Sequence, residues 1–127
     1  MVTIAASQTV QYEIPDEWWQ FCDLDTWHPQ SDFYPSLDLN DDAVQVVSLS
    51  DIQPLARDLG QVSPFRKYKL VPVLLRFQSP ECLLPAIDLV RIYGAAPYIY
   101  RLKNGFHRYA ASLMVGYKSI PARIEVE

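Results

Sequence analysis

The sequence has few of the residues that mark a metal centre, a disulfide framework or a disordered chain. Its 127 residues include two cysteines, Cys22 and Cys82, and two histidines, His28 and His107. The cysteines are too far apart for a CxxC or zinc-type spacing, so we expect two free thiols in a reducing cytosol. His28 and the acids near it have no ligand spacing, and we expect no metal site. Only four residues are glycine and half are apolar, so we expect an ordered chain.

Long apolar runs are also missing. No segment approaches the roughly 20 apolar residues that span a bilayer, and the first residues lack the charged and apolar regions of a targeting signal. We therefore expect a cytoplasmic protein without a membrane partner. The ten prolines favour short elements joined by defined turns over a helical bundle.

Positive charge is absent from the first 56 residues, which contain ten acids and no lysine or arginine. The remaining residues contain eleven basic side chains and five acids, so the two parts carry −10 and +6, which sum to the net charge of −4. This split suggests either that the acidic part lies against the basic part or that the basic part meets a phosphate-bearing partner. The overall acidity makes nucleic acid the weaker candidate partner.

Aromatic residues are concentrated in the acidic part, which holds all three tryptophans. Residues 14–24 predict a short helix with Pro15 in its first turn, and residues 28–42 are rich in turn formers and should be irregular. Weak strand signals precede them, at residues 2–4 and 9–12. We interpret residues 1–42 as an N-terminal extension. It either packs on the core, which we favour, or forms an exposed patch that binds a partner protein.

The core domain is predicted to span residues 43–127. Strands are expected where β-branched or alternating apolar residues occur, at residues 44–49, 86–92, 98–102 and 120–127. Residues 65–77 predict either a helix kinked at Pro72 or two shorter pieces. The strands at 86–92 and 98–102 are joined by a short link and should form a hairpin. Pro121 places the last strand at an edge or at a strand start, and its inward residues should be Ile120, Ala122, Ile124 and Val126.

The most informative stretch, residues 98–116, predicts a strand, a tight turn and a helix. Asn104 and Gly105 form the turn, and Gly116 stands where a left-handed C-terminal cap is expected. The helix begins with His107 and Arg108, so helix N–H groups and a cationic side chain should converge there. We predict an anion-binding site at this helix start. The alternative is a plain turn followed by a solvated arginine.

A resemblance to the sulfiredoxin and ParB-like superfamily is carried by residues 85–94 (PAIDLVRIYG), 104–111 (NGFHRYAA) and 120–124 (IPARI). It implies an α+β fold with a small mixed sheet and a few packed helices. It also implies that the turn and the helix start bind the phosphates of a nucleotide, such as ATP with Mg²⁺. The ligand-binding residues would then be Asn104, Gly105, Phe106, His107 and Arg108.

The sequence departs from this superfamily at chemically important positions. Sulfiredoxins have their catalytic cysteine immediately before the His-Arg pair, where this chain has Phe106, so we do not expect sulfinic-acid reduction. Gln53 stands where sulfiredoxins have an arginine, and Asn104 stands where many relatives have an acid. The helix-turn-helix region with which ParB proteins read DNA is also missing. The remaining acid–base candidates are His107 and Asp88, and Asp88 is equally well explained as a solvent-facing strand residue.

Three functions are consistent with these observations. The favoured one is a binding domain for a nucleotide or another phosphate ligand. The second is a phosphoryl transferase or nuclease that uses Asp88 or His107. The third is an interaction or inhibitory factor that acts through the acidic, Trp-rich first part. Arg66, Lys67 and Lys69 would extend the anion site if residues 65–77 pack beside it; otherwise they form a solvated helix face, which the sequence favours.

Overall fold

A computed structural model describes residues 2–7, 10–55 and 65–126, and the structural statements below refer to these residues. The helices are α1 (Asp16–Phe21), α2 (Lys67–Phe77) and α3 (Phe106–Val115), with a 3₁₀ turn at Leu49–Asp51. The strands are β1 (Val2–Ala5), β2 (Gln11–Ile14), β3 (Val44–Ser48), β4 (Ile52–Gln53), β5 (Ile87–Arg91), β6 (Tyr100–Asn104) and β7 (Ser119–Glu125). The α+β class predicted from the sequence is confirmed.

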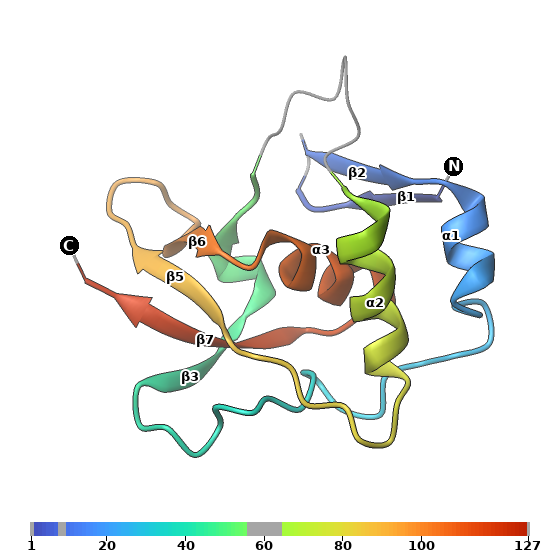
Figure 1. Ribbon diagram of the computed structural model, residues 1–127. Helices are drawn as coiled ribbons and strands as arrows, with labels where there is room; N and C mark the ends of the chain where they lie inside the picture. The colour runs from blue at the N-terminus through green and yellow to red at the C-terminus, as the bar shows by residue number, and fades with distance from the viewer. Residues whose placement is uncertain (1, 8–9, 56–64, 127) are drawn as a thin grey trace.

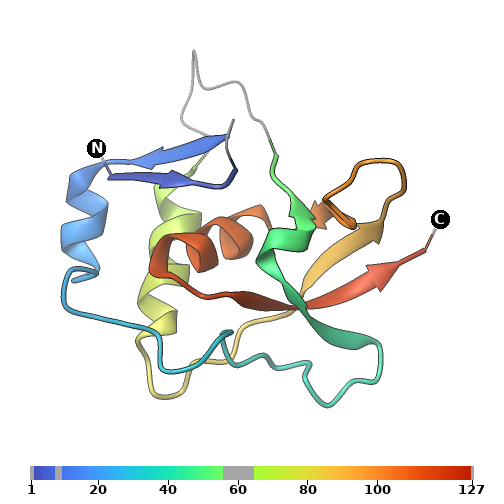
Figure 2. The ribbon, with the colours of Figure 1, turned by 180° about the vertical axis from the view of Figure 1, so that it is seen from behind.

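Five strands form a curled sheet in the order β3-β7-β5-β6-β4. Strands β5 and β6 are antiparallel, as the predicted hairpin requires, whereas β5 runs parallel to β7 and β4 runs parallel to β6. The sheet is therefore mixed. Figure 1 shows α3 inside the curl of the sheet with α2 beside it, and Figure 2 shows the same arrangement from behind. The sheet face toward these helices carries fully buried side chains: Ile87, Leu89, Ile120 and Ala122.

Of the two predicted places for Pro121, the structure contradicts the sheet edge and has Pro121 near the start of the strand, as its third residue. Strand β7 lies between β3 and β5 and is not an edge strand. Pro121 pairs with Val46 of β3, and pairing with β5 begins only at Ala122, so the missing N–H of proline interrupts no bond to β5. Val126 was expected to point inward, but it lies beyond the end of the strand and is 74% exposed.

Residues 67–77 form one helix that contains Pro72, which decides between the two predicted alternatives. Its buried side chains recur at helical spacing and face the core: Leu70, Val71, Leu74 and Phe77. Most of the link between Pro54 and Phe65 lies outside the described residues, as does Thr9 of the predicted strand at 9–12. None of the described helices is long and apolar enough to cross a membrane.

The predicted N-terminal extension contributes side chains to the hydrophobic core. Helix α1 begins directly after Pro15 and is shorter than predicted, and residues 28–42 are irregular apart from a bridge between Ser36 and Leu84. Five side chains of residues 1–42 belong to the same buried cluster as the sheet and the helices: Tyr12, Ile14, Cys22, Leu24 and Tyr34. In Figure 1 the β1–β2 hairpin lies across the upper end of α2 and above α3. The division of the chain after residue 42 stays a prediction.

Candidate functional site

The turn between β6 and α3 is built around Gly105. This residue has φ 102° and ψ 30°, a left-handed conformation that side chains with a Cβ rarely adopt. A Cβ at this position would also lie 2.6 Å from Cγ2 of Ile87, which is fully buried in β5. The first hydrogen bond of the helix is donated by the Tyr109 N–H to the Gly105 carbonyl at 2.9 Å, and no side chain caps the helix start. Glycine therefore lets the chain enter α3 in close contact with the sheet.

A cavity of about 340 Å³ opens at this helix start. It is lined by Leu55, Arg66, Lys69, Leu102, Lys103, Asn104, Gly105, Phe106 and His107. Three of these described residues are cationic and none is acidic. Arg66 and Lys69 belong to the start of α2, whereas Lys103 belongs to β6 and its ammonium pairs with the Glu125 carboxylate of β7 at 2.6 Å. The cavity thus combines a positive side-chain field with the positive end of the α3 dipole.

His107 connects the starts of α2 and α3. Its Nε2 accepts a hydrogen bond of 3.1 Å from the backbone N–H of Arg66, the residue that precedes α2. Because Nε2 is the acceptor, the proton of the neutral ring is on Nδ1. The imidazole also meets the rings of Phe65 and Phe106 edge-on, at centroid distances of 6.0 and 5.7 Å. These contacts fix the ring at the wall of the cavity.

Phe106 lies in an aromatic cluster rather than at a reactive surface. Its ring is 6% exposed, stacks on Phe65 at 5.4 Å with an interplanar angle of 8°, and meets Tyr12 edge-on at 5.6 Å. The Tyr12 hydroxyl donates to the Leu55 carbonyl at 3.0 Å. Strand β2, the residues flanking the cavity and α3 therefore share one packed unit. Sequence reasoning did not find this role of Tyr12, because the contact joins residues far apart in the chain.

Arg108 is not a lining residue of the cavity, although its Nη2 lies only 3.1 Å from the place that a Cβ on Gly105 would take. Its Nη1 donates a hydrogen bond of 3.0 Å to the Pro85 carbonyl, which also accepts one of 2.7 Å from the Tyr34 hydroxyl. Burial raises the pKa of Tyr34, so this hydroxyl remains a donor across the neutral range. Of the five predicted ligand residues, the cavity lining contains four, and Arg108 is not among them.

Asp88, the second acid–base candidate, also lies away from the cavity lining. It stands between the buried residues Ile87 and Leu89, so strand alternation places it on the opposite sheet face from α3. Its neighbours on the adjacent strands are Asn104 of β6 and Arg123 of β7. The structure therefore does not bring Asp88 and His107 together.

The start of α2 packs beside the cavity. From the sequence, its cations were expected to extend the anion site in this case. Arg66 and Lys69 line the cavity, whereas Lys67 is exposed and is not a lining residue. Sequence reasoning missed Lys103, although a cation directly before Asn104 and Gly105 was a usable signal.

Both thiols are buried away from the cavity. Cys22 follows α1 and Cys82 lies beyond the end of α2, and they are 1% and 5% exposed. Burial raises the pKa of both thiols. Neither is a lining residue of the cavity. They are therefore neutral, packed side chains rather than thiolates at the site.

Comparison with known proteins identifies a structural likeness. No protein-family model matches the chain, and no curated protein matches it. The crystal structure of sulfiredoxin from Arabidopsis thaliana matches 66% of this chain and 85% of its own, with a TM-score of 0.50 and 21% sequence identity. At 21% identity the likeness shows a shared fold and does not extend to activity. The chain has a sulfiredoxin-like α+β fold.

Proposed function

We propose that this chain binds a phosphate-bearing ligand, a nucleotide, in the cavity at the start of α3. The observation that carries the proposal is the charge of the lining, where Arg66 and Lys69 lie together and no described lining residue is acidic; the third lining cation, Lys103, pairs with Glu125. Phosphate oxygens accept charge-assisted hydrogen bonds from such groups. The dipole of α3 and the cationic side chains therefore both favour a negatively charged ligand.

We propose binding without sulfiredoxin-type chemistry. Reduction of a sulfinic acid needs a thiolate, and Phe106 occupies the position where sulfiredoxins have cysteine. The two thiols of this chain are buried elsewhere with raised pKa values. Phosphoryl transfer with an acid–base pair is also less well supported, since Asp88 is outside the cavity lining and His107 Nε2 already accepts the Arg66 N–H.

Isothermal titration with ATP, ADP, CTP and GTP, with and without Mg²⁺, tests this proposal. Lys69→Ala removes a cation from the lining and should weaken the binding of a nucleotide by roughly tenfold, or about 1.4 kcal/mol. Lys67→Ala is the matched control, because it removes the same charge from the same helix outside the cavity lining. Its affinity should stay within about twofold of wild type, since exposed charges act weakly at a distance.

Two outcomes would contradict the proposal. One is the absence of binding by the wild-type protein at roughly millimolar concentrations of all four nucleotides. The other is an equal loss of affinity in Lys67→Ala and Lys69→Ala, which would indicate non-specific attraction to the basic start of α2.

A further inference from the structure

Helix α2 presents an apolar strip on the side that faces away from the core. Tyr68, Pro72 and Leu75 follow one another at helical spacing on this side, and Tyr68 and Leu75 are 69% and 42% exposed. The strip borders a groove of about 510 Å³ lined by Pro72, Val73, Leu75, Arg76 and Leu84. An apolar surface of this kind, rimmed by charge, is typical of a contact site. We call Tyr68, Pro72, Leu75 and Arg76 the α2 surface.

All the charged side chains of α2 are positive. Helix α2 and the residue before it contain Arg66, Lys67, Lys69 and Arg76 and no acid. In the described part of the chain the ion pairs involve Lys103 and Arg123, and none of these four cations takes part. A partner of the α2 surface should therefore be acidic and should present a large apolar side chain.

Helix α1 and the residues after it present both an exposed apolar side chain and exposed acids. Phe21 at its C-terminal end is 64% exposed, and Glu17 lies one turn earlier on the same side of the helix. Asp23 follows directly and is exposed, and neither of these acids takes part in an ion pair of the described residues. No lysine or arginine occurs in the first 56 residues. We call Glu17, Phe21 and Asp23 the α1 surface.

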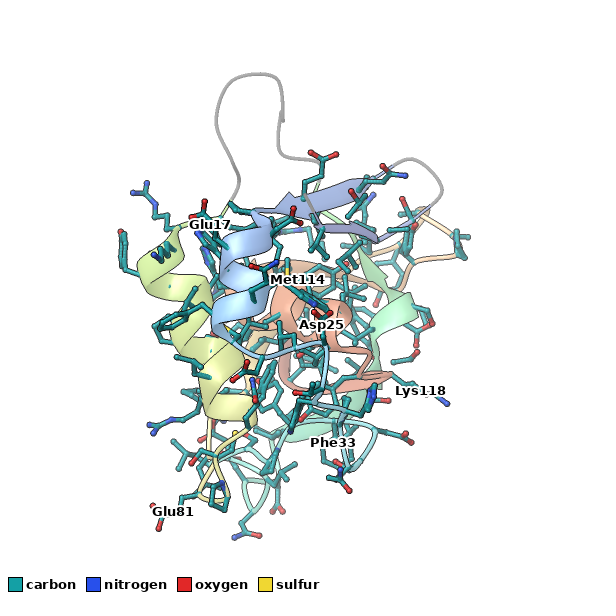
Figure 3. All side chains as sticks on the ribbon, turned by 90° about the vertical axis from the view of Figure 1, so that its right-hand side faces the viewer. Glu17, Asp25, Phe33, Glu81, Met114 and Lys118 are labelled. Atoms are coloured by element: carbon teal, nitrogen blue, oxygen red, sulfur yellow. The ribbon has the colours of Figure 1, made fainter. Side chains whose placement is uncertain are left out.

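The two surfaces lie on neighbouring elements. Helices α1 and α2 are side by side in Figure 1 and in Figure 3, where Glu17 marks α1 and Glu81 marks the turn beyond the end of α2. Their ends are joined by a hydrogen bond from the Gln78 amide to the Cys22 carbonyl. When two complementary surfaces are adjacent on one protomer, a two-fold axis can bring each surface against the complementary surface of the other copy. The result is a closed dimer with two equal contacts.

We propose that a second copy of this chain docks on the α2 surface through its α1 surface, and that the pairing is reciprocal. Phe21 of each copy enters the groove beside Pro72 and Leu75 of the other. The acids of the α1 surface then approach Arg76, so that burial of apolar area and charge attraction act together. This pairing uses neither the cavity at the start of α3 nor any ligand in it.

Sedimentation velocity of the full chain over a range of concentrations and salt tests the pairing. We expect the wild-type protein to form a dimer at roughly 100 µM, or about 5 kcal/mol of association, and to dissociate as salt rises. Leu75→Glu in the α2 surface and Phe21→Glu in the α1 surface should each give monomers. Val126→Glu is the matched control, because Val126 is 74% exposed outside both surfaces and receives the same charge. It should sediment like the wild type.

Circular dichroism confirms that each variant is folded before its mass is interpreted. A mixture of Leu75→Glu and Phe21→Glu keeps one intact surface of each kind, so the partial return of a dimer on mixing supports the pairing. A wild-type protein that stays monomeric at this concentration in low salt overturns the proposal. So does a dimer that survives in Phe21→Glu while Leu75→Glu abolishes it, since α2 would then pair with α2.

Discussion

Gly105 is held by a backbone constraint and by a packing constraint. Its φ of 102° is unfavourable for other residues, and its Cα hydrogen faces the side chain of Ile87 at a distance that leaves no room for a methyl group. This pair of constraints positions the first turn of α3 against β5. The proposed phosphate site depends on that position.

Gly105→Ala should lower the free energy of unfolding by about 3 kcal/mol, because both the strained φ and the contact with Ile87 contribute. Gly94→Ala is the matched control: its φ is also positive, at 73°, but a Cβ there meets nothing within 4 Å. The control should lose only about 1 kcal/mol. Urea denaturation of the three proteins measures the difference. Equal losses in the two variants would show that contact with Ile87 does not matter.

At the scale of elements, α2 combines a buried apolar side with a proline in its interior. Pro72 is the sixth residue of the helix, beyond the first turn where proline is tolerated, and it cannot donate to the carbonyl of Tyr68. Tertiary packing of the buried side keeps the helix continuous in spite of this missing bond. The local rule left open a kinked helix or two pieces, and the structure has one helix.

Pro72→Ala should raise the free energy of unfolding by about 1 kcal/mol or more. The gain is the restored hydrogen bond to Tyr68, partly offset by the greater freedom of the unfolded chain. Leu75→Ala, at an exposed position of the same helix, should stay within about 0.5 kcal/mol of wild type. Thermal and urea denaturation at low protein concentration, where the chain is monomeric, measure both. A less stable Pro72→Ala protein would contradict this account.

At the scale of the whole molecule, the acidic and basic parts meet at Arg123. Its guanidinium pairs with Asp41 at 2.7 Å and with Asp38 at 3.5 Å, across the predicted boundary between extension and core. Apolar packing crosses the same boundary through the buried rings of Tyr12 and Tyr34. The extension and the core therefore depend on each other.

Removal of residues 1–39 tests this dependence. We expect the remaining chain to lose cooperative unfolding, because the deletion exposes the core around Phe65, Phe106 and Phe77, which Tyr12 and Tyr34 cover by ring contacts. Near-ultraviolet circular dichroism and calorimetry report the loss. A shortened chain with a sharp thermal transition would instead support the prediction of a partner-binding extension.

Buried thiol and phenol groups should limit the stability of the protein at alkaline pH. Burial raises the pKa of the Cys22 and Cys82 thiols above the ordinary 9.0 and that of Tyr117 to about 12. The folded state thus prefers the neutral groups, whose contribution is complete below the unfolded pKa and is lost as pH rises through the folded pKa. The free energy of unfolding should be flat from about pH 7 to 8 and fall from about pH 9 upward.

Urea denaturation between pH 7 and 11 measures this decline. The double variant Cys22→Ala, Cys82→Ala is the control, because it removes both thiols and should flatten the curve near pH 9 while the fall caused by tyrosine remains. A wild-type curve that stays flat up to pH 11 would contradict the burial of these groups.

The sequence by itself determined the features that depend on local backbone preferences. The turn at Gly105, the cap at Gly116, a short helix near Pro15 and the β5–β6 hairpin were predicted, because φ/ψ limits and residue periodicity act over a few residues. The predicted bounds were wrong, since Asn104 ends β6 and Pro15 precedes α1 instead of lying in its first turn. The α+β class and the ligand residues 104–108 were predicted from the resemblance to a known superfamily, and four of these five residues line the cavity.

Only the tertiary structure decided what depends on contacts between distant residues. It placed β7 inside the sheet, brought Arg66 and Lys69 to the cavity, and turned Arg108 toward Pro85. A local pattern carries no information about these choices, because a helix start can direct an arginine either to a ligand or to a carbonyl. The competition is settled by which acceptor the packed core brings within reach, and here that acceptor is the Pro85 carbonyl.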